Sequence, residues 1–378
     1  MSRSTEHPPF PDDIPTHPLI VVDYARIVAG DEAEVDKLWD AATNLGFWYL
    51  KNHGVEVEAN GMFDMGEATM ALPLEEKMKY EQGDDGNSFG YKARGAIATG
   101  ASGARDIIEF INIGADDAHA YPDVVHRTYP PVVQNDFMGR VAQPFVRKST
   151  EVNNVLLRAF ERRLGLPDGA LAKRHDVREN SGSEARVTYV KASARGEGNT
   201  QDAPTQEKEK ETLAIGAHTD FGSLSFLHNR LGGLQVLPPG TDQWFYVRPI
   251  PGHAICNLGD AMAIFSGGIL RSNIHRVLPP PGAQRNFDRW SLVFFTRPGD
   301  SVVLKALADE SPLIARAVET AQRKESGSTS PGNNTATNLV NTGETAGEWF
   351  KRRIMNQRIN NRKGPETWAA SRGTEIRV

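Results

Sequence analysis

Short apolar runs separated by turn residues fill the second half of the chain. Between about residues 185 and 307 the runs include RVTYV, SLSFLH, WFYVRP, HAICNLGD and WSLVFFTRP, and Gly, Pro, Asn and Asp interrupt them. Strands of four to seven residues at such regular spacing predict a double-sheet roll or barrel. We therefore expect a β-rich body in this part of the chain.

The first half alternates between strand and helix spacing. Residues 19–23 predict a short buried strand, and Asp31 is the expected N-cap of the amphipathic helix that follows it. Residues 47–54 (FWYLKNHG) predict the next strand and its turn. Further helices are expected around 62–80 and over 137–164, where apolar positions recur at helical spacing.

Two polar segments and a basic tail differ from the rest of the chain. Residues 193–212 are rich in Gly, Gln, Glu and Lys and predict a solvated insertion. Residues 325–347 have low complexity and predict a disordered linker. The basic tail over 348–378 could contact RNA or a membrane, but its tryptophans and aliphatic residues favour a helical tail that packs back on the body.

Composition excludes several classes of function. Of the 378 residues, 39% are hydrophobic and 24% charged, which is enough to bury a sizeable core. A net charge of −5 gives no electrostatic footprint for nucleic acid, and the apolar runs are too short for a membrane helix. The single cysteine, Cys256, excludes an intrachain disulfide and a cysteine zinc site. We expect a cytoplasmic monomer whose partner is a small molecule, not nucleic acid or a membrane.

Two histidines and an aspartate in the strand-rich region have the pattern of a metal site. His218 and Asp220 stand two residues apart on a predicted strand, so their side chains emerge on the same face. His275 follows on another strand of the same region. Two imidazoles and one carboxylate on one face of a metal are the ligand set of non-haem iron oxygenases. A zinc hydrolase uses similar ligands, and a structural salt bridge is a further alternative.

An arginine and a serine on a later strand have the pattern of a carboxylate site. Arg289 and Ser291 stand at positions i and i+2 and share one face. An arginine that faces an apolar interior needs an anion, and a guanidinium beside a hydroxyl matches a carboxylate. Pairing with an internal acid is the alternative, although the adjacent Asp288 is expected to face the other way. Arg285 competes for the role, but it precedes the strand and has no serine two residues later.

Several segments follow one another along the chain in the order PLIVVDYARI, GFWYLKNHGV, DIIEFINIG, GAHTDFGSLSFL, NLGDAMAIFSGG, NIHRV, RWSLVFF and, in the tail, EWFKRRI. In this order they resemble the isopenicillin N synthase-like branch of the 2-oxoglutarate- and iron(II)-dependent dioxygenases, and fungal members especially. The resemblance implies an α+β fold whose double-stranded β-helix (jelly-roll) core is flanked by N-terminal and C-terminal helices. It also implies an N-terminal segment over 17–135 that packs on the core and a jelly-roll domain over 181–307.

The resemblance implies a catalytic centre as well. Fe(II) is expected on His218, Asp220 and His275. The co-substrate 2-oxoglutarate is expected to chelate this iron and to place its distal carboxylate on Arg289 and Ser291, and O2 is the second co-substrate.

Tyr189 and Phe295 complete the implied site. Tyr189 stands where the family places a contact to co-substrate or substrate, and Phe295 aligns with an aromatic that flanks the substrate. Two departures affect these expectations. Residues 188–191 read TYVK where many members have Asn-Tyr-Tyr-Pro, and a proline run at 279–281 lengthens the spacing between the last histidine and the arginine.

The implied function is oxidation of a small organic molecule by hydroxylation, desaturation or oxidative cyclisation, in secondary metabolism. An iron-dependent oxidase that acts without 2-oxoglutarate, as isopenicillin N synthase does, is the alternative, because the arginine and serine could hold the substrate's own carboxylate. A non-catalytic ligand-binding protein on the same fold is least expected, since the three candidate metal ligands and the candidate carboxylate site are all present.

Overall fold

Two β-sheets of unequal size form the centre of the computed structural model, which describes residues 7–101, 103–192, 213–326 and 341–374. The strands of the large sheet are, in spatial order, β1 (Val21–Asp23), β2 (Phe47–Lys51), β10 (His253–Leu258), β7 (Leu224–Asn229), β12 (Arg289–Thr296), β5 (Glu184–Val190), β4 (Glu109–Gly114) and β3 (Gly90–Lys92). Those of the small sheet are β6 (Ile215–His218), β11 (His275–Val277), β8 (Leu234–Val236) and β9 (Phe245–Tyr246). The predicted double-sheet roll, an α+β jelly-roll core, is confirmed.

Helices flank the sheets, and a separate two-stranded sheet of β13 (Val303–Lys305) and β14 (Asn341–Thr345) lies beside them. The helices are α1 (Tyr24–Val28), α2 (Glu32–Asn44), α3 (Glu56–Met70), α4 (Leu74–Met78), α5 (Ala115–Ala120), the π-helical η1 (Val132–Ala142), α6 (Gln143–Arg163), η2 (Ala172–His175), α8 (Asp260–Phe265), η4 (Gly282–Asn286), α9 (Pro312–Ser326), α11 (Ala346–Gln357), η5 (Ile359–Asn361) and α12 (Pro365–Ala370). None of the helices in the described ranges is long and apolar enough to cross a membrane.

The N-terminal segment extends the large sheet at both edges. Strand β2 pairs antiparallel with β10, with Tyr49 opposite Ile255. Strand β4 pairs antiparallel with β5, with Ile111 opposite Val187. The segment expected over 17–135 therefore shares its backbone hydrogen bonds with the core instead of forming a separate unit.

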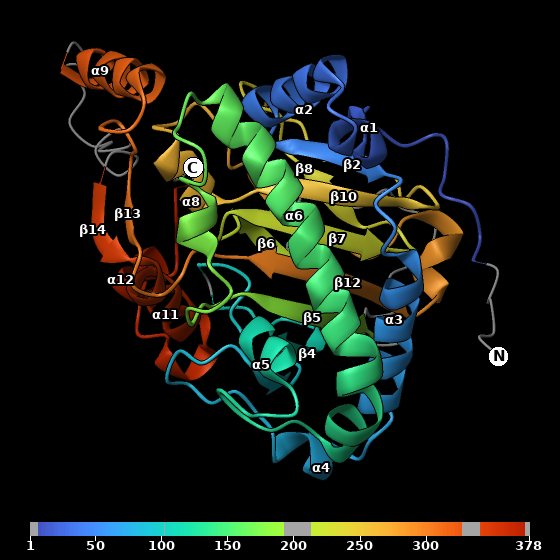
Figure 1. The fold of residues 1–378 in the computed structure, drawn as a ribbon. Helices are drawn as coiled ribbons and strands as arrows, with labels where there is room; N and C mark the ends of the chain where they lie inside the picture. Colours follow the sequence, from blue (N-terminus) through green and yellow to red (C-terminus); the bar gives the residue numbers. More distant parts are fainter. Residues whose placement is uncertain (1–6, 102, 193–212, 327–340, 375–378) are drawn as a thin grey trace.

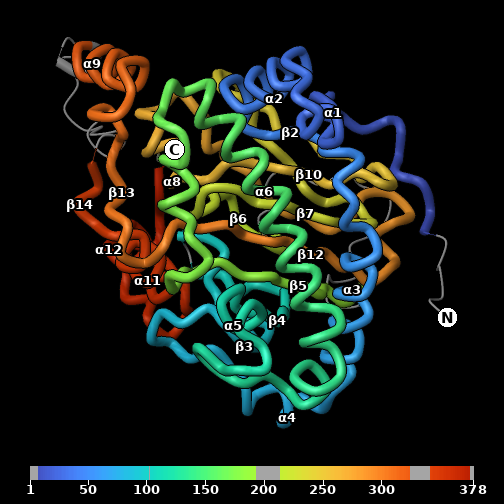
Figure 2. Tube along the Cα trace, viewed as in Figure 1, coloured from blue at the N-terminus to red at the C-terminus, as the bar shows by residue number. Residues whose placement is uncertain are grey.

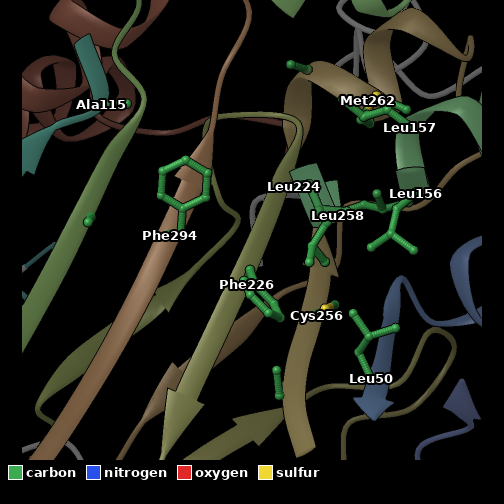
Figure 3. Close-up of a cluster of buried hydrophobic side chains, with 14 of the residues drawn as sticks. Leu50, Ala115, Leu156, Leu157, Leu224, Phe226, Cys256, Leu258, Met262 and Phe294 are labelled. Carbon is green, nitrogen blue, oxygen red and sulfur yellow. The ribbon is translucent and has the colours of Figure 1, made fainter. Parts of the chain in front are cut away.

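Helices α3 and α6 lie across one face of the large sheet (Figure 1). The buried face of α6 carries Phe145, Val152, Leu156 and Phe160, which recur at helical spacing. Figure 3 shows Leu156 beside side chains from β7 and β10. The side chains between these helices and the large sheet form the main hydrophobic core. The opposite face of the same strands carries the site described below.

Local sequence signals explain where several elements begin and end. The Asp31 carboxylate caps α2 by accepting hydrogen bonds from the N–H groups of Ala33 at 3.0 Å and Glu34 at 3.3 Å, as predicted. The helix expected around 62–80 begins earlier, at Glu56, and is divided into α3 and α4 just before Pro73. The helix expected over 137–164 is π-helical up to Ala142.

The C-terminal part of the chain differs from one expectation. The disordered linker predicted over 325–347 is wrong at its end, because β14 forms there, and residues 327–340 lie outside the described residues, as does the insertion at 193–212. The Thr342 hydroxyl donates to the Leu304 carbonyl at 3.0 Å, which ties β14 to β13. Helix α11 starts with a capping box of Thr345 and Glu348. As predicted, the tail is helical and packs back on the body, and Figure 2 shows α11 and α12 next to β13 and β14.

Candidate active site

The small sheet brings the two candidate histidines together. Strands β6 and β11 pair antiparallel with His218 directly opposite His275, and the two ring centroids lie 4.2 Å apart. Asp220 follows β6 and places its Oδ1 3.8 Å from His218 Nε2 and 3.7 Å from His275 Nε2. The three ligand atoms all lie within 4.8 Å of one another, so all three can reach one shared point.

Neighbouring groups orient these three side chains. His218 Nδ1 donates to the Gly216 carbonyl at 2.8 Å, and His275 Nδ1 donates to the Asn273 carbonyl at 3.2 Å. In the neutral tautomer that these hydrogen bonds select, Nε2 of each ring carries the free lone pair and faces the shared point. Asp220 Oδ2 accepts hydrogen bonds from Ser225 Oγ and from Asn257 Nδ2, the latter at 2.7 Å, so its Oδ1 is the atom aimed at the histidines.

The electrostatics of the cluster favour ligand protonation states. Burial, with a smaller contribution from His275, lowers the pKa of His218 to about 3. Burial alone would raise the pKa of Asp220, but the two histidines and the hydrogen bonds from Asn257 and Ser225 outweigh it and bring this pKa to about 2. The cluster thus presents a neutral imidazole and an ionised carboxylate at neutral pH. Two imidazole nitrogens and one carboxylate oxygen on one side of a shared point fit Fe(II) and leave room for further ligands.

A cavity of about 180 Å³ adjoins the cluster, and all three candidate ligands line it. Arg289 and Ser291, from β12, line the same cavity and are 3% and 6% exposed. Arg289 Nη1 donates to Ser291 Oγ at 3.1 Å, and Arg289 Nε donates to the Gly232 carbonyl at 2.8 Å. Thr188, on the neighbouring β5, lies 2.6 Å from Ser291 through their hydroxyl oxygens. Side chains alternate along β12 as expected, so Arg289 and Ser291 lie on one face of the strand and form a buried polar group with Thr188.

Phe295 lines the cavity, whereas Tyr189 is not among the residues of the described cavity wall, so its expected contact with co-substrate or substrate stays a prediction. The Tyr189 hydroxyl donates to Asp288 Oδ2 at 2.8 Å, and its ring stacks on Trp290 at 4.4 Å. Because side chains alternate along β5, the neighbouring Thr188 faces inward in its place. The competing Arg285 lies in η4 and is absent from the described cavity wall.

The C-terminal tail supplies a wall of the cavity that sequence analysis missed. Its lining residues are Ile354, Gln357, Trp368, Ser371 and Arg372. Arg372 also donates to the carbonyl of Ala217, next to a candidate ligand, at 2.8 Å. Helical periodicity predicted that the tail packs on the body, but it carries no information about which part of the body it meets.

A buried ion pair joins the tail to helix α8, and the same arginine contacts the backbone between His218 and Asp220. Arg353 of α11 pairs with Asp260 at the start of α8, and both residues are 0% exposed. Arg353 Nη2 donates to the carbonyl of Thr219, the residue between His218 and Asp220, at 3.2 Å. The Thr219 hydroxyl in turn donates to Asp260 Oδ2 at 3.2 Å. The tail therefore helps to fix the backbone between two candidate ligands.

Comparisons with known proteins agree with this architecture. The model of the 2OG-Fe(II) oxygenase superfamily matches residues 198–298, and the model described as the N-terminal region of the non-haem dioxygenase in morphine synthesis matches residues 19–134. A 2-oxoglutarate-dependent dioxygenase of Aspergillus fumigatus is 28% identical over 346 residues, covering 83% of this chain and 83% of the relative. A 1-aminocyclopropane-1-carboxylate oxidase of Dictyostelium discoideum is 25% identical over 322 residues, covering 80% and 87%.

Solved structures share the fold. The full-length T7H of Neurospora crassa, in complex with alpha-KG and thymine, superposes with a TM-score of 0.64 at 21% identity, covering 89% of this chain and 96% of that one. A dioxygenase for auxin oxidation from rice superposes with a TM-score of 0.55 at 19% identity, covering 88% and 99%. Since both halves of the chain match family models in the expected order and the curated relatives span most of its length, the chain belongs to the 2OG-Fe(II) oxygenase superfamily.

Proposed function

We propose that this enzyme oxidises a small organic molecule with O2 and 2-oxoglutarate, and that His218, Asp220 and His275 hold its Fe(II). The observation that carries the proposal is the convergence of three ligand atoms within 4.8 Å at the wall of a cavity. The same cavity contains the buried Arg289. One enclosed space thus offers sites for a metal and for an anionic co-substrate, as the chemistry of the superfamily requires.

Each part of the cavity has a distinct task in this proposal. When bound, Fe(II) and 2-oxoglutarate supply the activation of O2 for the oxidation. Ser225 and Asn257 hold the Asp220 carboxylate so that one oxygen faces the metal position. Arg289 and Ser291 bind the distal carboxylate of 2-oxoglutarate through a guanidinium and a hydroxyl, which together suit two carboxylate oxygens. The apolar walls exclude water and receive the substrate.

An iron-dependent oxidase that acts without 2-oxoglutarate is the second candidate. It is favoured by relatives named 1-aminocyclopropane-1-carboxylate oxidase, which are 25% identical to this chain. In that case Arg289 and Ser291 would bind the carboxylate of the substrate itself. The two candidates differ in whether 2-oxoglutarate binds and is converted to succinate.

The test uses full-length protein purified without O2 and loaded with Fe(II). We expect one Fe(II) per chain, 2-oxoglutarate binding in calorimetry that requires the metal, and release of succinate when O2 is admitted. An Asp220→Ala variant is the matched control and should do none of these. If 2-oxoglutarate neither binds nor is consumed, while an amino-acid-like carboxylate binds and requires Arg289, the oxidase is the correct assignment.

A further inference from the structure

Besides Arg289 and Arg372, two further arginines line the cavity. Arg186 of β5 and Arg297, which follows β12, both lie near the Phe295 ring, with guanidinium carbons 5.0 Å and 4.9 Å from its centroid. Arg186 is also 4.4 Å from the Phe110 ring, and Arg297 is 4.4 Å from the Phe350 ring. Each guanidinium group thus contacts two aromatic rings, which help to hold it in position.

These two cations share one carboxylate. Arg186 Nη2 and Arg297 Nη2 both donate to Glu184 Oε1, at 2.6 Å and 3.3 Å. The other oxygen of Glu184 already accepts from Ser88 at 2.7 Å and from Asn112 at 3.0 Å. Glu184 is fully buried. One carboxylate cannot fully neutralise two guanidinium groups, so the hydrogen-bonded group of Arg186, Arg297 and Glu184 carries an excess of positive charge.

The acids in the described part of the cavity wall already have other partners, although Asp220 also acts electrostatically on Arg297. They are Asp106 and Asp220. Asp106 is paired with the buried Lys92, and Asp220 belongs to the candidate metal cluster. An uncompensated positive charge in an apolar enclosure is costly. A ligand that brings a negative charge would remove this cost.

Arg186 has the geometry to receive such a ligand. Its Nε donates to Asn112 Oδ1 at 2.9 Å and its Nη2 to Glu184, but its Nη1 donates to no described residue. The side chain is 19% exposed and lines the cavity. Arg297, in contrast, is 6% exposed and is held by the Gly182 carbonyl and Glu184. Arg186 is therefore the binding group, and Arg297 is the residue that keeps the charge at this wall positive.

Arg186 lies apart from Arg289 along the paired strands. In the pairing of β5 with β12, Arg186 stands opposite Val293, while Arg289 stands opposite Val190. Four residues along β5 separate the two levels, which is about 13 Å. An anion on Arg289 and a second anion on Arg186 can thus occupy the cavity together.

We propose that Arg186 binds a carboxylate of the substrate, so that the substrate is a small organic acid with an apolar body. The apolar body follows from the apolar residues of the cavity wall, which include Ile97, Ile108, Phe110, Ile354 and Trp368. This inference rests on the proposed function, in which Arg289 is occupied by 2-oxoglutarate.

The test measures binding instead of turnover. Calorimetry uses full-length protein loaded with Zn(II) and 2-oxoglutarate, and the probes are 3-phenylpropionate, indole-3-propionate and octanoate, each compared with its primary amide. We expect at least one acid to bind about tenfold or more tightly than its amide, because only the acid offers a charged acceptor. Arg186→Met should abolish this preference, Arg186→Lys should retain part of it, and the exposed Arg178→Met should leave it unchanged.

Several outcomes would overturn the inference. They are equal affinity of acid and amide for every pair, no binding by any acid, or an Arg186→Met protein that loses 2-oxoglutarate affinity as Arg289→Met is expected to do. The first two need only the wild-type protein, so they stand even where a variant fails to fold. In each case succinate formation by the wild-type enzyme shows whether the proposed function itself still holds.

Discussion

Replacing Arg353 by methionine should weaken both the fold and the metal site, because this residue connects the C-terminal tail to helix α8 and to the backbone between His218 and Asp220. Its guanidinium lies fully buried between helices α11 and α8. It pairs with Asp260 and donates to the carbonyls of Thr219, at 3.2 Å, and Ser371, at 3.3 Å. Methionine keeps much of the volume but none of the donors.

The loss of stability depends on the Asp260 carboxylate, which stays buried when the arginine is removed. Asp260 is 0% exposed, and after the substitution its carboxylate keeps donors such as Thr219 Oγ1 and Ser272 Oγ but loses the cation. Breaking a buried pair by removing one partner costs about 3–5 kcal/mol. Domains are stable by roughly 5–15 kcal/mol, so the variant should remain folded with a large part of its stability gone.

The assay is urea unfolding of metal-free protein, followed by Fe(II) titration. We expect the urea midpoint of Arg353→Met to fall at unchanged slope and its Fe(II) affinity to drop by about tenfold, since Thr219 lies between two ligands. A double variant, Arg353→Met with Asp260→Leu, should recover part of the lost stability, because neither charge is then left unpaired. The exposed Arg178→Met should change neither quantity.

Two results would refute this reasoning. The first is a loss below about 1 kcal/mol for Arg353→Met, which is typical of exposed pairs. The second is strict additivity in the double variant, which would mean that the two charges do not interact across the helices.

Three further predictions concern the ligands, the co-substrate and pH. His218→Ala should lose Fe(II) binding in anaerobic titrations yet keep the wild-type urea midpoint measured without metal; full activity of this variant would remove the residue from the site. Arg289→Met should weaken 2-oxoglutarate binding by about a hundredfold, because a desolvated charged pair is worth a few kcal/mol, while Arg285→Met should change it little; the reverse order in calorimetry would contradict the assignment. Burial, with a contribution from His53, lowers the pKa of His228 from 6.5 to about 3. As the pH falls below 6.5, this histidine therefore binds a proton in the unfolded chain but not in the folded protein. The free energy of unfolding should drop by about 2 kcal/mol between about pH 7 and pH 5. Urea midpoints of His228→Phe should depend less steeply on pH in this window, and an identical slope would show that His228 does not carry the effect.

Local patterns determined the secondary structure where a short-range cause exists. The cap at Asp31 and the alternation along Arg289–Thr296 act within a few residues, so both could be predicted from the sequence. The break before Pro73 also has a local cause, because a proline disfavours helical geometry in the residue before it. The prediction of one helix over 62–80 did not take this signal into account. The strand at Asn341–Thr345 was not predictable from its polar composition, since its partner β13 and the hydrogen bond from Thr342 stabilise it.

The candidate site likewise has features with a local cause and features that depend on contacts between distant parts of the chain. The spacing of His218 and Asp220, and of Arg289 and Ser291, determines which side chains share a face of one strand, and the sequence alone was sufficient for that. The sequence did not show which face of β5 points into the cavity, and in the structure Thr188, not the neighbouring Tyr189, belongs to the described cavity wall.

Only the tertiary structure decided how these faces meet. The pairing of β6 with β11 sets His218 against His275, and the Arg353–Asp260 pair brings the tail across the cavity. The sharing of Glu184 by Arg186 and Arg297 likewise depends on β5 lying beside β12. Periodicity records which face of an element is buried, whereas the identity of the element that covers it depends on contacts between residues far apart in the chain.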